Sequence, residues 1–299
     1  MKIGVQPLFV KGITCRPDWV AEFVGTVEEE GGDSIWGVEH VLVPEDYKPN
    51  YPYSTDGRMP ATEQTVMPDP LAWLAYAAAL SKTLRLGTSV LVLPQHSPVQ
   101  LAKRLATMDE LSGGRVMLGI GIGWSEEEYD ALNIPFNRRG PRMDEYVAAM
   151  RALWQPGAAS FDGEFVRFNR VHCDPKPVQA GGVPIIIGGS TEVAAKRAGR
   201  LGDGFYPYVI SPEDLALRVA DIRTAALAAG RDPAAVELTV WPGSWQFRAS
   251  LDVDVMRRYL TLPVQRVVVS MHEADQPTFP ALRELIRRSR DVIEQAGAA

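Results

Sequence analysis

Eight short apolar runs, each followed by a longer segment of helical periodicity, set the organisation of this chain. A crossover helix returns the chain so that the next strand lies parallel to the last, and the repeated pattern therefore predicts a parallel sheet. Several of the helical segments open with proline, which the first turn of a helix tolerates. The expected strands are 2–7, 34–40, 84–93, 116–123, 183–189, 204–207, 236–240 and 266–271. The expected helices are 17–30, 69–81, 98–111, 141–154, 191–201, 212–229, 252–259 and 279–293.

Eight such units in 299 residues, of which 46% are hydrophobic, favour a TIM (β/α)8 barrel that spans 1–299 as a single domain. An open doubly wound sheet, which usually has fewer strands, is the alternative. In a barrel the active-site residues come from the loops that follow the strands. We therefore expect the functional residues at the carboxyl ends of the predicted strands.

Insertions are expected after the second strand, after the fourth strand and before the fifth. Residues 41–68 are rich in proline and tyrosine and too long for a simple connector, so they predict a lid or pocket wall. Residues 155–182 alternate like a hairpin around Asp162 and Gly163. Because this piece follows a helix, it should lie at the opposite face of the barrel and serve the structure.

The charge and composition of the chain indicate a small-molecule partner. The formal net charge is −6 and the chain has no long run of Lys or Arg, which argues against nucleic acid or an anionic membrane as partner. No signal peptide and no apolar stretch of about 18 residues is found, so we expect a cytoplasmic protein. Cys15 and Cys173 are far apart, and no metal-ligand motif, nucleotide-triphosphate loop or serine-hydrolase motif is present.

Glu39 and His40 end the second strand, where a barrel would present them to a substrate. Strict alternation along the strand would turn one of the two inward. Histidine is the side chain that most readily exchanges protons near neutral pH, which makes His40 a candidate acid or base. A structural histidine is the alternative.

The fifth strand runs directly into Gly188, Gly189, Ser190 and Thr191, after which a helix begins. The free N–H groups and the positive dipole end of that helix face the loop, and glycine lets the backbone approach a ligand. The segment therefore predicts a phosphate site, to which the two hydroxyls would add donors. An ordinary helix cap is the alternative, but it does not account for the paired glycines.

The fourth strand ends in "GIGIGW", with glycines at 119, 121 and 123 before Trp124. A dinucleotide-binding turn needs a third small residue, and Trp124 or Glu126 occupies that place in the two possible frames. The glycines instead indicate a strand kept thin beside a bulky group. The three glutamates at 126–128 are interpreted as a solvated helix start.

Taken together, these segments resemble the bacterial luciferase-like superfamily of flavin and deazaflavin barrels. The resemblance is carried by "SIWGVEHVLVP", "LRLGTSVLVLP", "SPVQLAKRLATMDELSGGRVMLGIGIGW", "FNRRGPRMDEY", "HCDPKPVQ" and "PIIIGGSTEVAAKRAGRLGDGF". The order of the motifs is most similar to the branch of oxidoreductases that use the deazaflavin coenzyme F420. Barrels of this family commonly form dimers, so the resemblance implies a homodimer.

The resemblance implies a role for each matching residue. His40 would act as acid or base near the ring, and Glu39 would contact the cofactor. Ser89 and Val90 would form a non-proline cis peptide that backs the ring, with Gly121 beside the cofactor. Gly188, Gly189, Ser190 and Thr191 would receive the cofactor phosphate. Trp36, Tyr51, Tyr53 and Trp124 would line the substrate pocket.

Trp124 departs from the pattern of the members that oxidise glucose phosphate, which hold a glutamate there. The resemblance therefore implies an F420-dependent hydride transfer to a small organic substrate other than a sugar phosphate. An FMN-dependent monooxygenase is the alternative, because glutamate followed by histidine also occurs in flavin-using relatives. A non-catalytic flavin-binding carrier is a third possibility, to which the missing carboxylate points.

Overall fold

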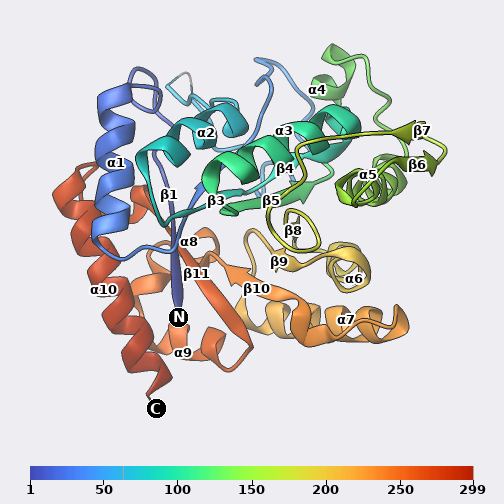
Figure 1. The fold of residues 1–299 in the computed structure, drawn as a ribbon. Coiled ribbons are helices and arrows are strands. Elements are labelled where there is room, and N and C mark those ends of the chain that lie inside the picture. Colours follow the sequence, from blue (N-terminus) through green and yellow to red (C-terminus); the bar gives the residue numbers. More distant parts are fainter. Residues whose placement is uncertain (63, 299) are drawn as a thin grey trace.

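The computed structural model describes residues 1–62 and 64–298 of the chain. Nine parallel strand segments form one sheet in the order β3-β2-β1-β11-β10-β9-β8-β5-β4, and a further pairing of β3 with β5 closes it. The third place in the barrel is shared by β3 and β4, so the closed sheet is the expected TIM barrel, ringed by helices (Figure 1). Its strands are β1 Lys2–Gln6, β2 Ser34–Gly37, β3 Arg85–Thr88, β4 Leu91–Val92, β5 Val116–Gly121, β8 Ile185–Gly188, β9 Gly204–Tyr206, β10 Glu237–Val240 and β11 Val264–Ser270.

Each predicted helix is present, with ends that differ by a few residues. Proline at the first turn and a capping side chain from Asp69, Ser97, Ser211 or Thr278 start four of the long helices. The α-helices are α1 Pro17–Glu29, α2 Pro70–Leu80, α3 Pro98–Ser112, α4 Glu126–Ala131, α5 Arg139–Trp154, α6 Glu192–Leu201, α7 Pro212–Ala228, α8 Pro242–Trp245, α9 Val253–Leu260 and α10 Phe279–Gly297. Short 3-10 helices are η1 Leu93–Gln95, η2 Pro233–Ala235, η3 Ala249–Leu251 and η4 Met271–Glu273.

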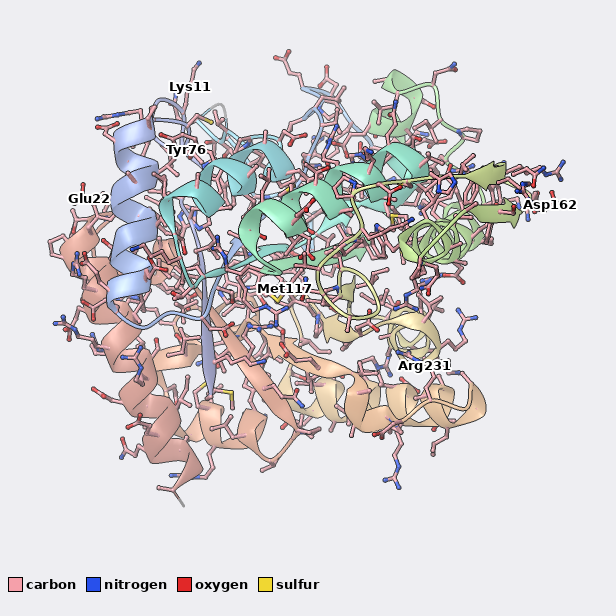
Figure 2. The ribbon with its side chains drawn as sticks, viewed as in Figure 1. Lys11, Glu22, Tyr76, Met117, Asp162 and Arg231 are labelled. Atoms are coloured by element: carbon pink, nitrogen blue, oxygen red, sulfur yellow. The ribbon has the colours of Figure 1, made fainter. Side chains whose placement is uncertain are left out.

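Alternation along the strands divides the core into two parts. Val5, Leu118 and Ile187 point outward and belong to the large core between barrel and helices. Each such fully buried side chain stabilises the fold by about 1.5–3 kcal/mol. A second, smaller cluster fills the barrel interior and consists of Trp36, Met117, Ile186, Tyr206 and Val268. Figure 2 shows Met117 near the centre of the molecule.

Two predicted strands are shorter than their apolar runs. The second ends at Gly37, so Glu39 and His40 lie in the loop beyond it. The third is interrupted between Thr88 and Leu91, where Ser89 and Val90 are joined by a cis peptide bond. Both differences lie at the carboxyl ends of strands, where the chain leaves the sheet ladder to form the site.

Residues 41–62 and 64–68 contain neither a helix nor a strand, apart from a single bridge between Thr65 and Val10. Internal hydrogen bonds hold the segment: Tyr51 N–H donates to the Gly57 carbonyl (2.8 Å) and Met59 N–H to the Tyr47 hydroxyl (2.9 Å). The segment lies at the same end of the barrel as α4 (Figure 1). The expected insertion after the second strand is therefore present.

The predicted hairpin is formed by β6 Ala159–Asp162 and β7 Arg167–Val171. Its turn does not stay at the face where α5 ends. The N–H groups of Glu164, Phe165 and Val166 donate to the Glu145 carboxylate in the second turn of α5 (2.7–2.9 Å). The hairpin thus runs back along α5 and covers it, which corrects its expected position while keeping a structural use.

Within residues 1–62 and 64–298, the search for a helix of the length and apolarity needed to cross a membrane finds none.

Candidate functional site

Glu39 and His40 point to different neighbours at the end of the second barrel strand. Glu39 is 6% exposed, and its Oε2 accepts a hydrogen bond from Val92 N–H at 2.6 Å. His96 Nε2, at the end of η1, lies 2.9 Å from Glu39 Oε1. Both carboxylate oxygens are thus used to join the second strand to the third. The expected contact of Glu39 with a cofactor stays a prediction.

His40 pairs with the carboxylate of Glu128, which the sequence pattern had predicted to be solvated. Its Nδ1 lies 3.2 Å from both Oε1 and Oε2 of Glu128. The side chain of Glu128 is 1% exposed, whereas that of His40 is 15% exposed. Among the described residues no hydrogen bond reaches His40 Nε2. One nitrogen is therefore fixed, and the other is available at the barrel mouth.

Glu128 was missed because it sits in a run of three glutamates that suggests a solvated turn. A signal was present, since Ser125 and Glu128 match the S-x-x-E capping box. Ser125 does cap α4, accepting from Glu128 N–H at 3.3 Å, but the Glu128 side chain reaches His40 instead of returning to the cap. The partner of His40 lies 88 residues away in the sequence, and a local pattern cannot reveal that contact.

Val90 fills the space that the glycines of neighbouring strands leave free. A Cβ on Gly121 would lie 2.7 Å from Val90 Cγ2, and one on Gly188 would meet Val90 Cγ1. Ser89, joined to Val90 by the expected cis bond, accepts a hydrogen bond from Gln6 Nε2 at 3.1 Å. The half-buried Val90 side chain is therefore held at the barrel mouth between β5 and β8.

The "GIGIG" run is explained by the same contact with the third barrel strand. A Cβ on Gly119 would meet the Thr88 carbonyl oxygen, and one on Gly123 would lie 2.7 Å from Val92 Cγ1. All three alternate glycines thus face the interrupted third strand. The expectation of a thin strand beside a bulky group is confirmed. The bulky group is the segment from Thr88 to Val92 of the third barrel strand.

The loop after β8 keeps backbone N–H groups free for an anion. Gly189 has φ +99°, which favours glycine, and Thr191 caps α6 by accepting from Ala194 N–H at 3.2 Å. In the described part of the chain, the N–H groups of Ser190 and Thr191 donate to no protein acceptor. The Ser190 hydroxyl instead donates to the Tyr208 carbonyl. A role of either hydroxyl at an anion stays a prediction.

Aromatic rings cover the barrel mouth. Trp124 packs against His40, Tyr47 and Tyr51 with ring centroids 5.2–5.9 Å apart. Its buried indole Nε1 has no hydrogen-bond partner among residues 1–62 and 64–298. Burial raises the pKa of Tyr51, whose hydroxyl also interacts with Tyr208. The rings give this end of the barrel an apolar wall, and contact of Tyr51 and Trp124 with a substrate stays a prediction.

The aromatic wall continues from Tyr53 to Tyr208 and Trp241, with centroids 4.9 and 5.6 Å apart. Trp36 is not part of it. That side chain has no exposed surface, and its Nε1 donates to Ser34 Oγ at 3.0 Å in the barrel interior. Its expected place on the pocket wall is therefore corrected, because the side chain belongs to the buried cluster inside the barrel.

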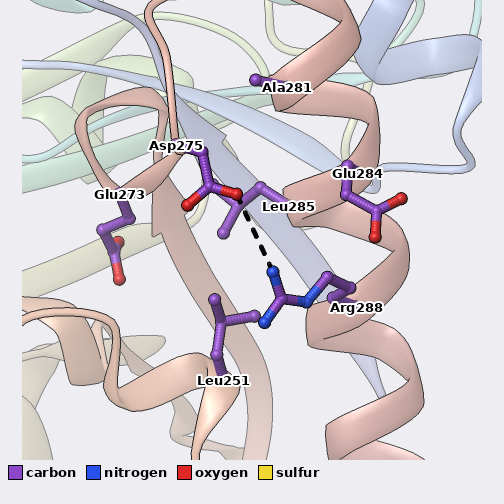
Figure 3. Close-up of a pocket in the computed structure, with 7 residues that line it drawn as sticks. All are labelled: Leu251, Glu273, Asp275, Ala281, Glu284, Leu285 and Arg288. Atoms are coloured by element: carbon purple, nitrogen blue, oxygen red, sulfur yellow. Dashed lines mark ion pairs between the residues drawn. The ribbon is translucent and has the colours of Figure 1, made fainter.

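A buried acid lies on the far side of the mouth, after the eighth barrel strand. Glu273 is 2% exposed and accepts from Trp241 Nε1 (2.7 Å) and Ser270 N–H (2.8 Å). Burial raises the pKa of the Glu273 carboxyl, against the effect of these hydrogen bonds. Figure 3 shows its side chain directed away from Arg288, which faces Asp275 across a small cavity beside α10. Glu273 is one of the residues that line this cavity.

No group of three or more His, Cys, Asp or Glu suited to a metal ion is found among residues 1–62 and 64–298. The described residues at the mouth instead provide His40, an apolar wall of aromatic rings and the Val90 side chain packed against glycines. The loop after β8 adds backbone N–H groups without a described protein acceptor. The sequence pattern of a known family, described as luciferase-like monooxygenase, matches residues 15–289 of the chain. The chain belongs to that family.

Curated relatives include proteins of both cofactor types. An uncharacterised protein of Mycobacterium tuberculosis is 36% identical over 249 residues, covering 82% of this chain and 84% of the relative. An F420-dependent glucose-6-phosphate dehydrogenase of Nocardia farcinica is 41% identical over 143 residues, 46% of this chain and 42% of its own length. An FMNH2-dependent dimethylsulfone monooxygenase of Pseudomonas putida is 35% identical over 157 residues, 51% of this chain and 43% of its own.

A solved structure supports the fold over nearly the whole chain. The F420-dependent tetrahydromethanopterin reductase of Methanopyrus kandleri superposes with a TM-score of 0.73 at 15% identity and covers 98% of each chain. The luciferase-like family, with F420-dependent and FMN-dependent oxidoreductases among its relatives, is thus the setting in which the site is interpreted.

Proposed function

We propose that the protein is an oxidoreductase that transfers a hydride between the deazaflavin coenzyme F420 and a small organic substrate other than a sugar phosphate. The proposal is carried by the half-buried His40. Its Nδ1 is bound to Glu128, and no hydrogen bond from the described part of the chain reaches its Nε2. Redox chemistry at a bound ring needs such a group to exchange the accompanying proton.

The residues at the mouth fit a phosphate-bearing ring cofactor. The free N–H groups of Ser190 and Thr191, at the positive end of α6, would hold the phosphate, and Gly189 lets the backbone come close. Val90 would support the ring on one side. When bound, the deazaflavin supplies the carbon that gives or accepts the hydride.

The chain's own residues prepare the site for that chemistry. His40 Nε2 accepts a proton from the substrate or returns one, depending on the direction of the reaction. Trp124 and Tyr51 exclude water and offer an apolar surface to the substrate. The buried Trp124 Nε1 is an unpaired donor that a substrate acceptor could satisfy.

Sugar phosphate is excluded from the proposal because Trp124 stands at the end of the fourth barrel strand. An indole N–H donates a hydrogen bond but cannot deliver a proton as a carboxylic acid does. The Nocardia farcinica relative supports the cofactor, since its name states F420 dependence, but it matches under half of this chain.

An FMN-dependent monooxygenase is the second candidate, favoured by the similarity to the Pseudomonas putida monooxygenase. The phosphate loop and ring platform would serve FMN equally well. A non-catalytic flavin carrier is the alternative of another class. Turnover separates these three readings, because only the first consumes reduced F420 in the absence of oxygen.

The test measures the consumption of reduced F420, without oxygen, in the presence of a panel of enones, ketones and imines. It also measures the consumption of oxidised F420 in the presence of alcohols. We expect consumption with at least one substrate, and a fall in kcat of roughly 10²-fold or more in His40→Ala with less than a threefold change in cofactor affinity. The control is His172→Ala, which removes an exposed histidine directly after β7.

Bound F420 without consumption across the panel would favour the carrier. Oxygen-dependent turnover of reduced FMN alone would favour the monooxygenase. Unchanged turnover in His40→Ala would remove that residue from the mechanism.

A further inference from the structure

We propose that Glu128 is a positioning residue. It holds the N–H of neutral His40 at Nδ1 and so leaves Nε2 as the nitrogen that exchanges a proton. The inference rests on the proposed function, because it concerns the histidine that the proposed reaction uses. It assigns to α4 a part in the chemistry that the sequence pattern of three glutamates does not suggest.

The Glu128 side chain is almost fully buried. Glu128 lies in the first turn of α4 and is 1% exposed, although its neighbours Glu126 and Glu127 are only partly buried. A buried carboxylate is costly unless hydrogen-bond donors satisfy it. Apart from His40, the donor that reaches Glu128 Oε1 is Leu42 N–H at a long 3.4 Å. His40 is therefore the principal partner of this carboxylate.

The geometry sets the direction of the bond. His40 Nδ1 lies at 3.2 Å from each oxygen of Glu128, and an ionised carboxylate can only accept. Nδ1 must therefore carry the hydrogen. Because a neutral imidazole has a single N–H, Nε2 is left with the lone pair.

The consequence is a defined proton path. An N–H bond forms at Nε2 as the substrate O–H bond breaks, and the imidazolium so formed stays beside the negative Glu128. In the reverse direction the Nε2–H bond breaks and the proton returns to the substrate. Carboxylates behind histidines orient other catalytic and metal-bound imidazoles in the same way.

The other two glutamates of α4 have different partners and provide matched controls. Glu127 Oε1 accepts from Lys48 N–H at 2.9 Å, and Glu126 Oε2 lies 3.0 Å from Lys48 Nζ. Neither of them contacts His40 through a described hydrogen bond. Replacing either with glutamine removes the same charge from the same helix turn while leaving the His40 contact intact.

The primary experiment needs neither cofactor nor substrate. In 15N-labelled apoprotein, imidazole NMR spectra report which nitrogen of neutral His40 is protonated, with His40→Gln identifying the signal. We expect the Nδ1–H form to dominate in the wild type by roughly tenfold and the Nε2–H form to become substantial in Glu128→Gln. Glu127→Gln should match the wild type. A wild-type Nε2–H form, or no change in Glu128→Gln, would overturn the inference.

Turnover provides the second readout. Glu128→Gln should lower kcat by about 10- to 100-fold with KM changed by less than threefold, the range found when an outer partner of a functional histidine is removed. Glu128→Asp, which retains the charge, should recover part of the loss. A melting temperature near that of the wild type shows that folding is intact.

The two claims fail separately. If the protonated nitrogen of His40 changes in Glu128→Gln as expected but no F420 binds, the proposed function fails and the role of Glu128 stands. If F420 binds and Glu128→Gln turns over normally, the proposed function stands and the inference is wrong.

Discussion

Val90 and the glycines around it show how single residues shape the mouth of this barrel. The side chain of Val90 occupies the volume that a Cβ on Gly121 or Gly188 would need. Valine is stiff at χ1, so it cannot easily swing away. The packing at this point is therefore set by the pairing of one branched side chain with glycines on two neighbouring strands.

We predict that Gly121→Ala destabilises the protein by about 1–3 kcal/mol, because its methyl group would overlap Val90 Cγ2. Urea denaturation measures the change. Adding Val90→Ala removes the overlapping atoms, so Gly121→Ala should cost at least 1 kcal/mol less in that background. Equal costs in both backgrounds would show that Val90 is not the obstacle.

At the residue scale, the sequence predicted positions better than contacts. His40 lies just beyond the carboxyl end of the second strand, close to its predicted place, although the strand itself ends at Gly37. Its partner Glu128 and the engagement of Glu39 with Val92 and His96 were not foreseen. These contacts join three different barrel units, and only the closed fold brings them together.

At the scale of elements, α4 attaches the segment that follows the second strand. Glu127 accepts from Lys48 N–H, and Glu128 holds His40 at the start of that segment. The short helix thus joins the wall of the mouth to the fourth barrel unit. The glutamates at 126–128 predicted only the start of this helix, because six residues are too few to show a helical period.

We predict that Glu127→Ala speeds hydrogen exchange at the Lys48 amide by about tenfold, since a hydrogen bond to a carboxylate is lost. Exchange followed by NMR or mass spectrometry over residues 41–62 measures the effect. Glu126→Ala removes only the ion pair with the exposed Lys48 side chain and should change exchange less than threefold. A similar rate in wild type and Glu127→Ala would refute the attachment.

The number and order of the strands and long helices followed from the sequence because each unit repeats one local pattern. The ends of the second and third strands did not. At these points the chain stops pairing with the neighbouring strands, which places His40 and Val90 at the mouth. The apolar residues continue past both points, so composition alone does not show where the strands end.

At the scale of the whole molecule, a partly buried carboxylate links distant units and makes stability depend on pH. Glu28, at the end of α1, accepts from the Thr83 and Lys82 N–H groups and the Ser81 hydroxyl (2.7–2.9 Å). Burial opposes its ionisation, but the hydrogen bonds prevail and lower the pKa of Glu28 to about 2. This carboxylate ties α1 to the start of the third barrel strand.

A lowered pKa means that the folded protein favours the ionised form, so the stabilisation is present above about pH 5 and is lost as the pH falls towards 2. We predict that Glu28→Gln lowers the free energy of unfolding by about 1–2 kcal/mol at pH 6. The gap to the wild type should narrow between pH 5 and 3. Urea denaturation across this range measures it, and a constant gap would contradict the assignment.

The homodimer and the cytoplasmic location remain predictions, because a single chain carries no contact that tests either. The cofactor decides the central claim. The mouth offers free N–H groups, a seated valine and a histidine with one open nitrogen, which suit either ring system in geometry.

The most direct measurement is an equilibrium titration of the purified apoprotein with oxidised F420 and, in parallel, with FMN, followed by ring fluorescence. We predict a micromolar or tighter dissociation constant for F420, about −8 kcal/mol or better, and at least tenfold weaker binding of FMN. Micromolar binding of FMN with no binding of F420 would contradict the proposal.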